Sequence, residues 1–218
     1  MSIKAVVFDM DGVLIDAREW HFEALNRALG LFGYTIPHDV HETRFDGLPT
    51  KTKLEMLSQE TSLPRGLHEF VNRMKQIYTG QIIEEKLAPR KQHVDALLRL
   101  KQEGYKLAVA SNSIRSTITK MMERSHLASF LDFYLSNEDV TQPKPSPQIY
   151  LKAMCMAGVT ADECLVLEDS PFGLRAAHES GAHVLQVQSV DDVYYGAIKD
   201  RIRAIESREV KPSYRRAA

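Results

Sequence analysis

The sequence contains few cysteines, little excess charge and no long apolar run. It has two cysteines, Cys155 and Cys164, among 218 residues. A chain of this length builds a core without disulfides, so we expect both to be buried small hydrophobic residues in a reducing compartment. Lys and Arg number 28 against 29 Asp and Glu, which gives a net charge of −1. Such a balance does not draw a protein to nucleic acid or to a membrane surface.

Targeting patterns are equally scarce. No window approaches about 18 uninterrupted apolar residues, so we expect no membrane span. The first residues, MSIKAVVFDMDG, hold an apolar run that is too short for a secretory leader and that ends in acids. We therefore expect a cytoplasmic protein. The sequence does not distinguish a monomer from a small homo-oligomer.

Five short apolar runs rich in β-branched residues predict strands. They lie at 3–8, 106–111, 131–136, 164–168 and 183–187. Their hydrophobicity is continuous rather than alternating, which is typical of strands covered on both faces of a parallel sheet. Helical patterns separate them, and Ser146 and Ser170 are the expected N-caps of two of these helices. The alternation predicts a doubly wound α/β fold with right-handed crossovers.

One interval breaks this alternation. From about residue 16 to residue 88 the sequence contains amphipathic helical pieces, at 19–33, 50–60 and 68–85, and no convincing strand. This block is too long for a simple crossover. We expect an all-helical cap domain over 16–88, inserted into an α/β core made of 1–15 and 89–218.

Charged and hydroxyl residues follow the predicted strands. The first strand ends in Asp9-Met10-Asp11-Gly12, the second in Ser111-Asn112 and the fourth in Glu168-Asp169, and Lys144 follows the third. Ligands of open α/β sheets bind outside the carboxyl ends of the strands. Four carboxylates at one edge repel one another unless a cation lies among them. Oxygen ligands without histidine or cysteine favour Mg²⁺ before Ca²⁺.

The same set of groups suits phosphoryl transfer. A magnesium site of this kind takes a substrate phosphate as a ligand, and a lysine and a serine hydroxyl can hold the other phosphoryl oxygens. Asp9 and Asp11 are two apart in extended chain, so both can approach one phosphate, and Gly12 permits an abrupt departure from the strand. One carboxylate can attack while the other exchanges a proton with the leaving oxygen and then with water.

Four segments together resemble the four motifs of the haloacid dehalogenase superfamily, in order and over nearly the whole chain. They are VVFDMDGVLID (6–16), ASNS (110–113), PKPSP (143–147) and LEDSPFGLRAA (167–177). A helical insertion straight after the first motif is similar to the subgroup that includes β-phosphoglucomutase and many small-molecule phosphatases.

The resemblance implies a role for each matching residue. Asp9 is the expected nucleophile, and Asp11 the general acid/base with its backbone carbonyl on Mg²⁺. Ser111 and Asn112 are expected to bind the phosphate, and Lys144 to steady the nucleophile and the phosphoryl charge. The metal ligands implied are Asp9, Asp11, Glu168 and Asp169.

Substrate contacts in the cap are suggested by two further stretches. His21 matches a histidine at the gate of the mutase site, although a surface or partly buried histidine is an equal alternative. The segment FDGLPTKTKL (45–54) resembles the loop that contacts substrate in relatives. Gly47 to Lys53 are therefore expected to face the active site, with Lys53 as the candidate for a distal anionic group and a solvated lysine as the alternative.

These features predict a phosphatase that hydrolyses a small phosphorylated metabolite, such as a sugar phosphate, through an aspartyl-phosphate. The runner-up is a sugar-phosphate mutase, but Thr50-Lys51-Thr52 stand where that enzyme carries an arginine for a second phosphate. A phospho-accepting signalling module and a dehalogenase are further alternatives. Such modules are usually about half this length, and Asp11 argues for a leaving group that needs a proton. No GxxxxGK[ST] loop is present, which argues against a kinase.

Overall fold

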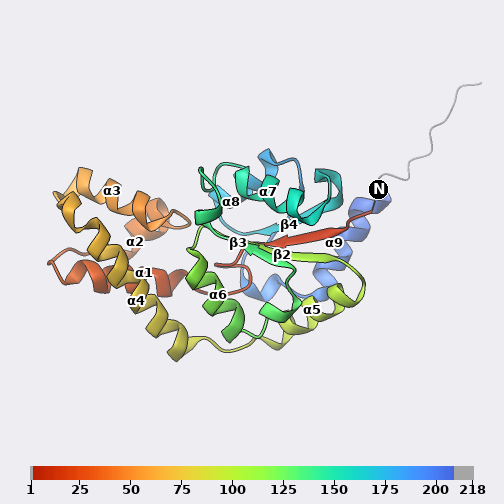
Figure 1. The fold of residues 1–218 in the computed structure, drawn as a ribbon, viewed down its shortest axis with the longest axis horizontal. Helices are drawn as coiled ribbons and strands as arrows, with labels where there is room; N and C mark the ends of the chain where they lie inside the picture. Colours follow the sequence, from red (N-terminus) through yellow and green to blue (C-terminus); the bar gives the residue numbers. More distant parts are fainter. Residues whose placement is uncertain (1, 209–218) are drawn as a thin grey trace, which may run out of the picture.

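The computed structural model describes residues 2–208 and consists of a five-stranded parallel sheet with helices on both faces and a group of helices beside it (Figure 1). The strands are β1 (Ala5–Phe8), β2 (Lys106–Ala110), β3 (Phe133–Leu135), β4 (Cys164–Glu168) and β5 (His183–Gln186). Their order is β3-β2-β1-β4-β5, so β2 and β3 are added on one side of β1, and β4 and β5 are added on the other side. The predicted doubly wound α/β fold is confirmed.

Alternate residues of the central strand supply the two layers of the core. Val6 and Phe8 face one layer, while Ala5 and Val7 face the other. The first layer is covered by α5 (Lys91–Gln102), α6 (Arg115–Arg124) and α9 (Tyr195–Arg208), and the second by α7 (Gln148–Ala157) and α8 (Pro171–Glu179). This double cover explains why the strands are continuously apolar.

The segment after β1 folds into helices around a hydrophobic cluster of its own. They are α1 (Arg18–Gly30), α2 (His38–Val40), a π-helical turn η1 (His41–Phe45), α3 (Thr50–Thr61) and α4 (His68–Lys86). Leu25, Phe45, Leu54 and Val71 are buried among them. We call this helical group the cap. Its predicted domain bounds, 16 and 88, stay a prediction.

Short 3₁₀ turns complete the connections. They are η2 (Arg65–Leu67), η3 (Ala128–Phe130), η4 (Asn137–Asp139), η5 (Ala161–Glu163) and η6 (Val190–Asp192). Over residues 2–208, no helix is both long and apolar enough to cross a membrane.

Two local predictions were wrong. Cys164 is buried in β4, but Cys155 is exposed, because α7 turns Tyr150 and Ala153 toward the sheet and Cys155 away from it. α7 also begins at Gln148, with Pro147 rather than Ser146 in the capping position. The other predicted cap holds: the Ser170 hydroxyl accepts a hydrogen bond from the Gly173 amide at the start of α8.

Candidate active site

Parallel strands bring the predicted acids to one edge of the sheet. Asp9 follows β1 and Glu168 ends the neighbouring β4, where Phe8 pairs in register with Leu167. Ser111 follows β2 on the other side of β1, and its backbone amide bonds to Leu135 of β3. The structure thus brings together residues that are far apart in the sequence.

Lys144 lies between two of these acids. Its Nζ donates to Asp9 Oδ1 at 2.6 Å and to Glu168 Oε1 at 2.5 Å, and its side chain is 3% exposed. Burial disfavours the ammonium, but the charges of Asp9 and Glu168 outweigh it and raise the pKa of Lys144. Burial, and then the charge of Glu168, raises the pKa of Asp9 well above its usual range. Asp9 thus needs more positive charge than Lys144 supplies to stay ionised.

Glu168 is held by the turn between β4 and α8 and by Tyr150 of α7. Its Oε2 accepts hydrogen bonds from the backbone amides of Asp169 at 3.0 Å and Ser170 at 3.3 Å, while the Tyr150 hydroxyl donates to Oε1 at 2.6 Å. A Cβ on Gly173 would overlap the Glu168 carboxylate, so only glycine fits there. The start of α8 is therefore shaped around this carboxylate.

The acid group fits a divalent cation. Carboxylate oxygens of Asp9, Glu168 and Asp169 lie within 4.8 Å of one another. Asp169 Oδ2 accepts a hydrogen bond from Arg18, while its Oδ1 is buried and has no hydrogen-bond partner among residues 2–208. A buried carboxylate oxygen without a donor is costly, and a hard cation satisfies it. Asp9, Glu168 and Asp169 are thus suited to hold Mg²⁺.

Asp11 faces the cap instead. The Ser113 hydroxyl donates to its Oδ2 at 2.9 Å, and Nε2 of His21 on α1 lies 2.9 Å from its Oδ1. Burial alone would raise the pKa of Asp11, but His21 and Ser113 together lower it. Lys75 Nζ on α4 donates to Nδ1 of His21 at 3.1 Å. The His21 ring is thereby oriented with its other nitrogen toward Asp11.

Asn112 connects the cap loop to the core. Its Nδ2 donates to the carbonyl of Gly47 at 3.1 Å, and its Oδ1 accepts from the backbone amide of Lys144 at 3.0 Å. The Asn112 side chain therefore has partners of its own, and its role in phosphate binding stays a prediction, as does that of Ser111. Gly47 lies in the loop between η1 and α3, and its φ of +73° suits glycine.

Two lysines of the cap are buried beside the site. Lys53 on α3 is 6% exposed and Lys75 is 7% exposed, and neither makes an ion pair within the described part of the chain. Burial lowers the pKa of each to about 8. Both line a cavity of about 150 Å³ that also contains Asp9, Asp11 and Gly47. All residues from Gly47 to Lys53 except Thr52 line this cavity, and their contact with substrate stays a prediction.

Sequence patterns did not reveal four residues of the site, namely Arg18, Lys75, Ser113 and Tyr150. Ser113 could have been found, because it lies two residues beyond Ser111 in the same strand-end turn. Tyr150 has the spacing of a core residue, and only the structure places its hydroxyl against Glu168. Arg18 and Lys75 contact residues 151 and 54 positions away, which no local pattern reports.

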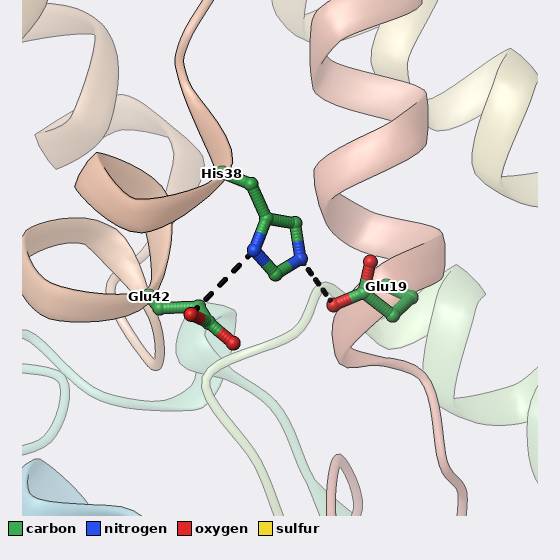
Figure 2. Close-up of side chains that lie close together, drawn as sticks. All are labelled: Glu19, His38 and Glu42. Carbon is green, nitrogen blue, oxygen red and sulfur yellow. Dashed lines mark hydrogen bonds and ion pairs between the residues drawn. The ribbon is translucent and has the colours of Figure 1, made fainter.

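A second group of possible metal ligands lies on the cap surface (Figure 2). His38 is flanked by Glu19, with 2.9 Å from Nε2 to Oε1, and by Glu42, with 3.5 Å from Nδ1 to Oε2. The two carboxylates pair with different ring nitrogens, and all three side chains are exposed, as acidic groups without a metal commonly are. The hydrogen bond that His38 donates to Glu19 raises the pKa of His38. We interpret this group as an ion-paired histidine that joins α1 to α2.

The fold and the acid cluster define a phosphoryl-transfer enzyme with a capped α/β core: acids and a lysine at the carboxyl edge of a parallel sheet, under a helical cap.

Comparison with known proteins identifies the family. The sequence profile described as "Haloacid dehalogenase-like hydrolase" matches residues 6–187. "Phosphorylated carbohydrates phosphatase" of Thermotoga maritima is 30% identical over 182 residues, which is 82% of each chain. "Beta-phosphoglucomutase" of Bacillus subtilis is 30% identical over 195 residues, 85% of this chain and 83% of that one. The solved β-phosphoglucomutase of Clostridium difficile has a TM-score of 0.80 at 20% identity and covers 94% of this chain and 99% of its own.

The chain therefore belongs to the haloacid dehalogenase-like hydrolases, and it is a phosphatase of that family. The resemblance expected from the four motifs is confirmed.

Proposed function

We propose that this phosphatase uses Mg²⁺ to hydrolyse a small phosphorylated metabolite of the sugar-phosphate class through an aspartyl-phosphate on Asp9. The observation that carries the proposal is the contact of Asp9 with Lys144 at 2.6 Å inside a cluster of three carboxylates. A carboxylate in this setting is oriented and partly charge-compensated, which are the properties of a positioned nucleophile.

In the first step an oxygen of Asp9 attacks phosphorus, and the bond from phosphorus to the metabolite oxygen breaks. Asp11 gives a proton to that leaving oxygen, because the negative charge of an arriving phosphate raises the pKa of Asp11. In the second step Asp11 takes a proton from water, and the hydroxide oxygen displaces Asp9 from phosphorus. Lys144 stabilises negative charge on Asp9 and on the phosphoryl group throughout.

Bound Mg²⁺ would supply charge neutralisation for the phosphoryl oxygens, held by Asp9, Glu168 and Asp169, with the Asp11 carbonyl implied by the family resemblance. The cap excludes bulk water during the first step, since His21 and Gly47 contact the core at Asp11 and Asn112.

Substrate choice is proposed to depend on Lys53 and Lys75. Two buried lysines without carboxylate partners in residues 2–208 leave uncompensated positive charge beside the cavity. A substrate with a second anionic group, a phosphate or a carboxylate, would compensate it. The phosphorylated carbohydrates named for the Thermotoga maritima relative are compatible with this class.

Lys53 and Lys75 would also suit a sugar-phosphate mutase, because a mutase must bind a second phosphate group. The two activities separate on glucose 1-phosphate supplied with a trace of the bisphosphate. We expect free phosphate, whereas isomerised hexose phosphate would identify a mutase. The cytoplasmic location expected from the sequence stays a prediction.

Screening phosphorylated sugars, nucleotides and glycolytic intermediates for phosphate release tests the proposal. We expect turnover with Mg²⁺ that stops on chelation and returns with added ion, and substrates with two anionic groups should have the lower KM. Asp9→Asn should abolish turnover and leave the fold intact. The matched control is Asp95→Asn, an exposed aspartate of α5. Substantial hydrolysis by Asp9→Asn would refute the assignment of the nucleophile.

A further inference from the structure

Arg18 contacts the acid cluster from the first turn of α1. Its Nη2 donates to Asp169 Oδ2, and its Nε lies 3.7 Å from Asp46 Oδ2 in the loop before α3. The Arg18 side chain is 41% exposed, whereas that of Asp169 is completely buried. A residue of the cap thus reaches a buried carboxylate of the core and is held above it by a second acid of the cap.

The two oxygens of Asp169 are in different situations. Oδ2 is bonded to Arg18, and Oδ1 has no hydrogen-bond partner in the described residues. A hydrogen bond to one oxygen restrains the orientation of a carboxylate, so the bond to Oδ2 influences where Oδ1 points. A carboxylate oxygen of Asp169 lies within 4.8 Å of the oxygens of Asp9 and Glu168.

Two other groups, Gly12 and Lys144, lie near the Asp169 carboxylate. Gly12 lies against the Asp169 carboxylate with φ of +91°, and a Cβ there would overlap Oδ2. The backbone of the turn after β1 therefore lies close to this oxygen. Lys144 is engaged by Asp9 and Glu168. In the described structure the side chain that donates to Asp169 Oδ2 is Arg18 of the cap.

We infer that Arg18 is a positioning residue that binds one oxygen of Asp169 and thereby presents the other to the divalent cation. Partners of this kind, one bond removed from the metal, commonly change metal affinity by about 10- to 100-fold. The alternative is that Arg18 acts only as a positive charge near the site, or takes the place of the cation. The two ideas predict opposite signs, because loss of a nearby positive charge alone strengthens binding of a divalent cation.

The experiment measures metal binding to the full chain without substrate. Mn²⁺ serves as the probe, and its free concentration is read by electron paramagnetic resonance during titration. We expect Arg18→Gln to weaken Mn²⁺ binding by about tenfold or more. Arg18→Lys should recover much of the affinity, because an ammonium can still donate to Oδ2. Thermal unfolding without metal verifies that each variant is folded. If Arg18→Gln does not fold, the Mn²⁺ affinity of Arg18→Lys is compared with that of the wild type.

Two controls accompany it. Arg27→Gln removes the same charge from α1 at an exposed position paired with Glu23, and should bind Mn²⁺ as the wild type does. Asp169→Asn should lose the ion. Unchanged or tighter binding in Arg18→Gln, with loss in Asp169→Asn, would overturn the role of Arg18 and leave the proposed function intact. Unchanged binding in Asp169→Asn would overturn the metal site on which both proposals rest.

Discussion

Lys53→Met tests whether the cap holds an uncompensated buried charge. The Lys53 side chain is 6% exposed, and the hydrogen-bond partner of its Nζ in the described structure is His41 Nε2, at 3.4 Å. Burial, followed by the charge of Lys53, lowers the pKa of His41 to about 3, so this ring stays neutral and cannot compensate the ammonium. Methionine has a similar length and no charge, so it should fill the same space.

The size of the effect follows from the pKa of Lys53. Its lowering from 10.5 to about 8 corresponds to on the order of 3 kcal/mol against the charged form. Below pH 8 Lys53 is charged in both the folded and the unfolded chain, so the whole penalty is present at pH 7. Between pH 8 and pH 10.5 the unfolded chain binds the proton that the folded chain has lost, so stability rises with pH. Above pH 10.5 both states are neutral and the penalty is gone.

We therefore expect Lys53→Met to raise the free energy of unfolding by about 1–3 kcal/mol at pH 7. The difference from the wild type should shrink as the pH approaches 10. Urea denaturation across this range measures both. Lys51→Met, an exposed lysine of the same helix, should leave stability unchanged. A Lys53→Met protein that is less stable than the wild type, or one whose advantage does not depend on pH, would refute the reasoning. The same variant should raise KM for doubly anionic substrates, a loss of function in exchange for stability.

Other changes test single groups of the site. Asp11→Asn should slow turnover by about 10²- to 10⁴-fold; mass spectrometry of the quenched enzyme should find phosphoryl-Asp9, and an unchanged rate would assign the proton transfer elsewhere. Tyr150→Phe removes a buried hydrogen bond to Glu168, so urea denaturation should report a loss of about 1–3 kcal/mol; equal stability would mean that the bond is dispensable. Gly173→Ala should lower Tm clearly, because the new methyl overlaps the Glu168 carboxylate; an unchanged Tm would contradict that packing.

The sequence predicted the sheet well because its strands are buried on both faces. The strand expected at 164–168 has the same bounds as β4, whereas within the run 3–8 strand β1 begins at Ala5. Hydrophobicity marks where a segment is apolar, but strand pairing decides where the ladder begins. The same limit explains Cys155, since an apolar run does not reveal which side of a helix faces the core.

Site residues that follow strands could be predicted from the sequence, whereas the contacts made by residues of the cap could not. Asp9 and Glu168 stand at the ends of neighbouring parallel strands, so topology alone brings them together. The contacts of Arg18 and Lys75 depend on how the cap sits over the core, which is a matter of packing between segments far apart in the chain. For His21 the sequence favoured neither a place at the entrance of the active site nor a place on the surface or partly buried, and in the structure its Nε2 lies 2.9 Å from Asp11 Oδ1.

Charge is divided between the two parts of the molecule. The core contributes four carboxylates and Lys144, while the cap contributes Arg18, Lys53 and Lys75 together with one acid, Asp46. Cap and core therefore attract one another across the cavity, and buried charges of this kind are screened little by salt. We expect an anionic substrate to enter on the cap side, where Lys53 and Lys75 lie, and a cation to bind on the core side, where acids outnumber Lys144. Under the proposed function the site takes two ligands of opposite sign, and the contact of Arg18 with Asp169 is where the two halves meet.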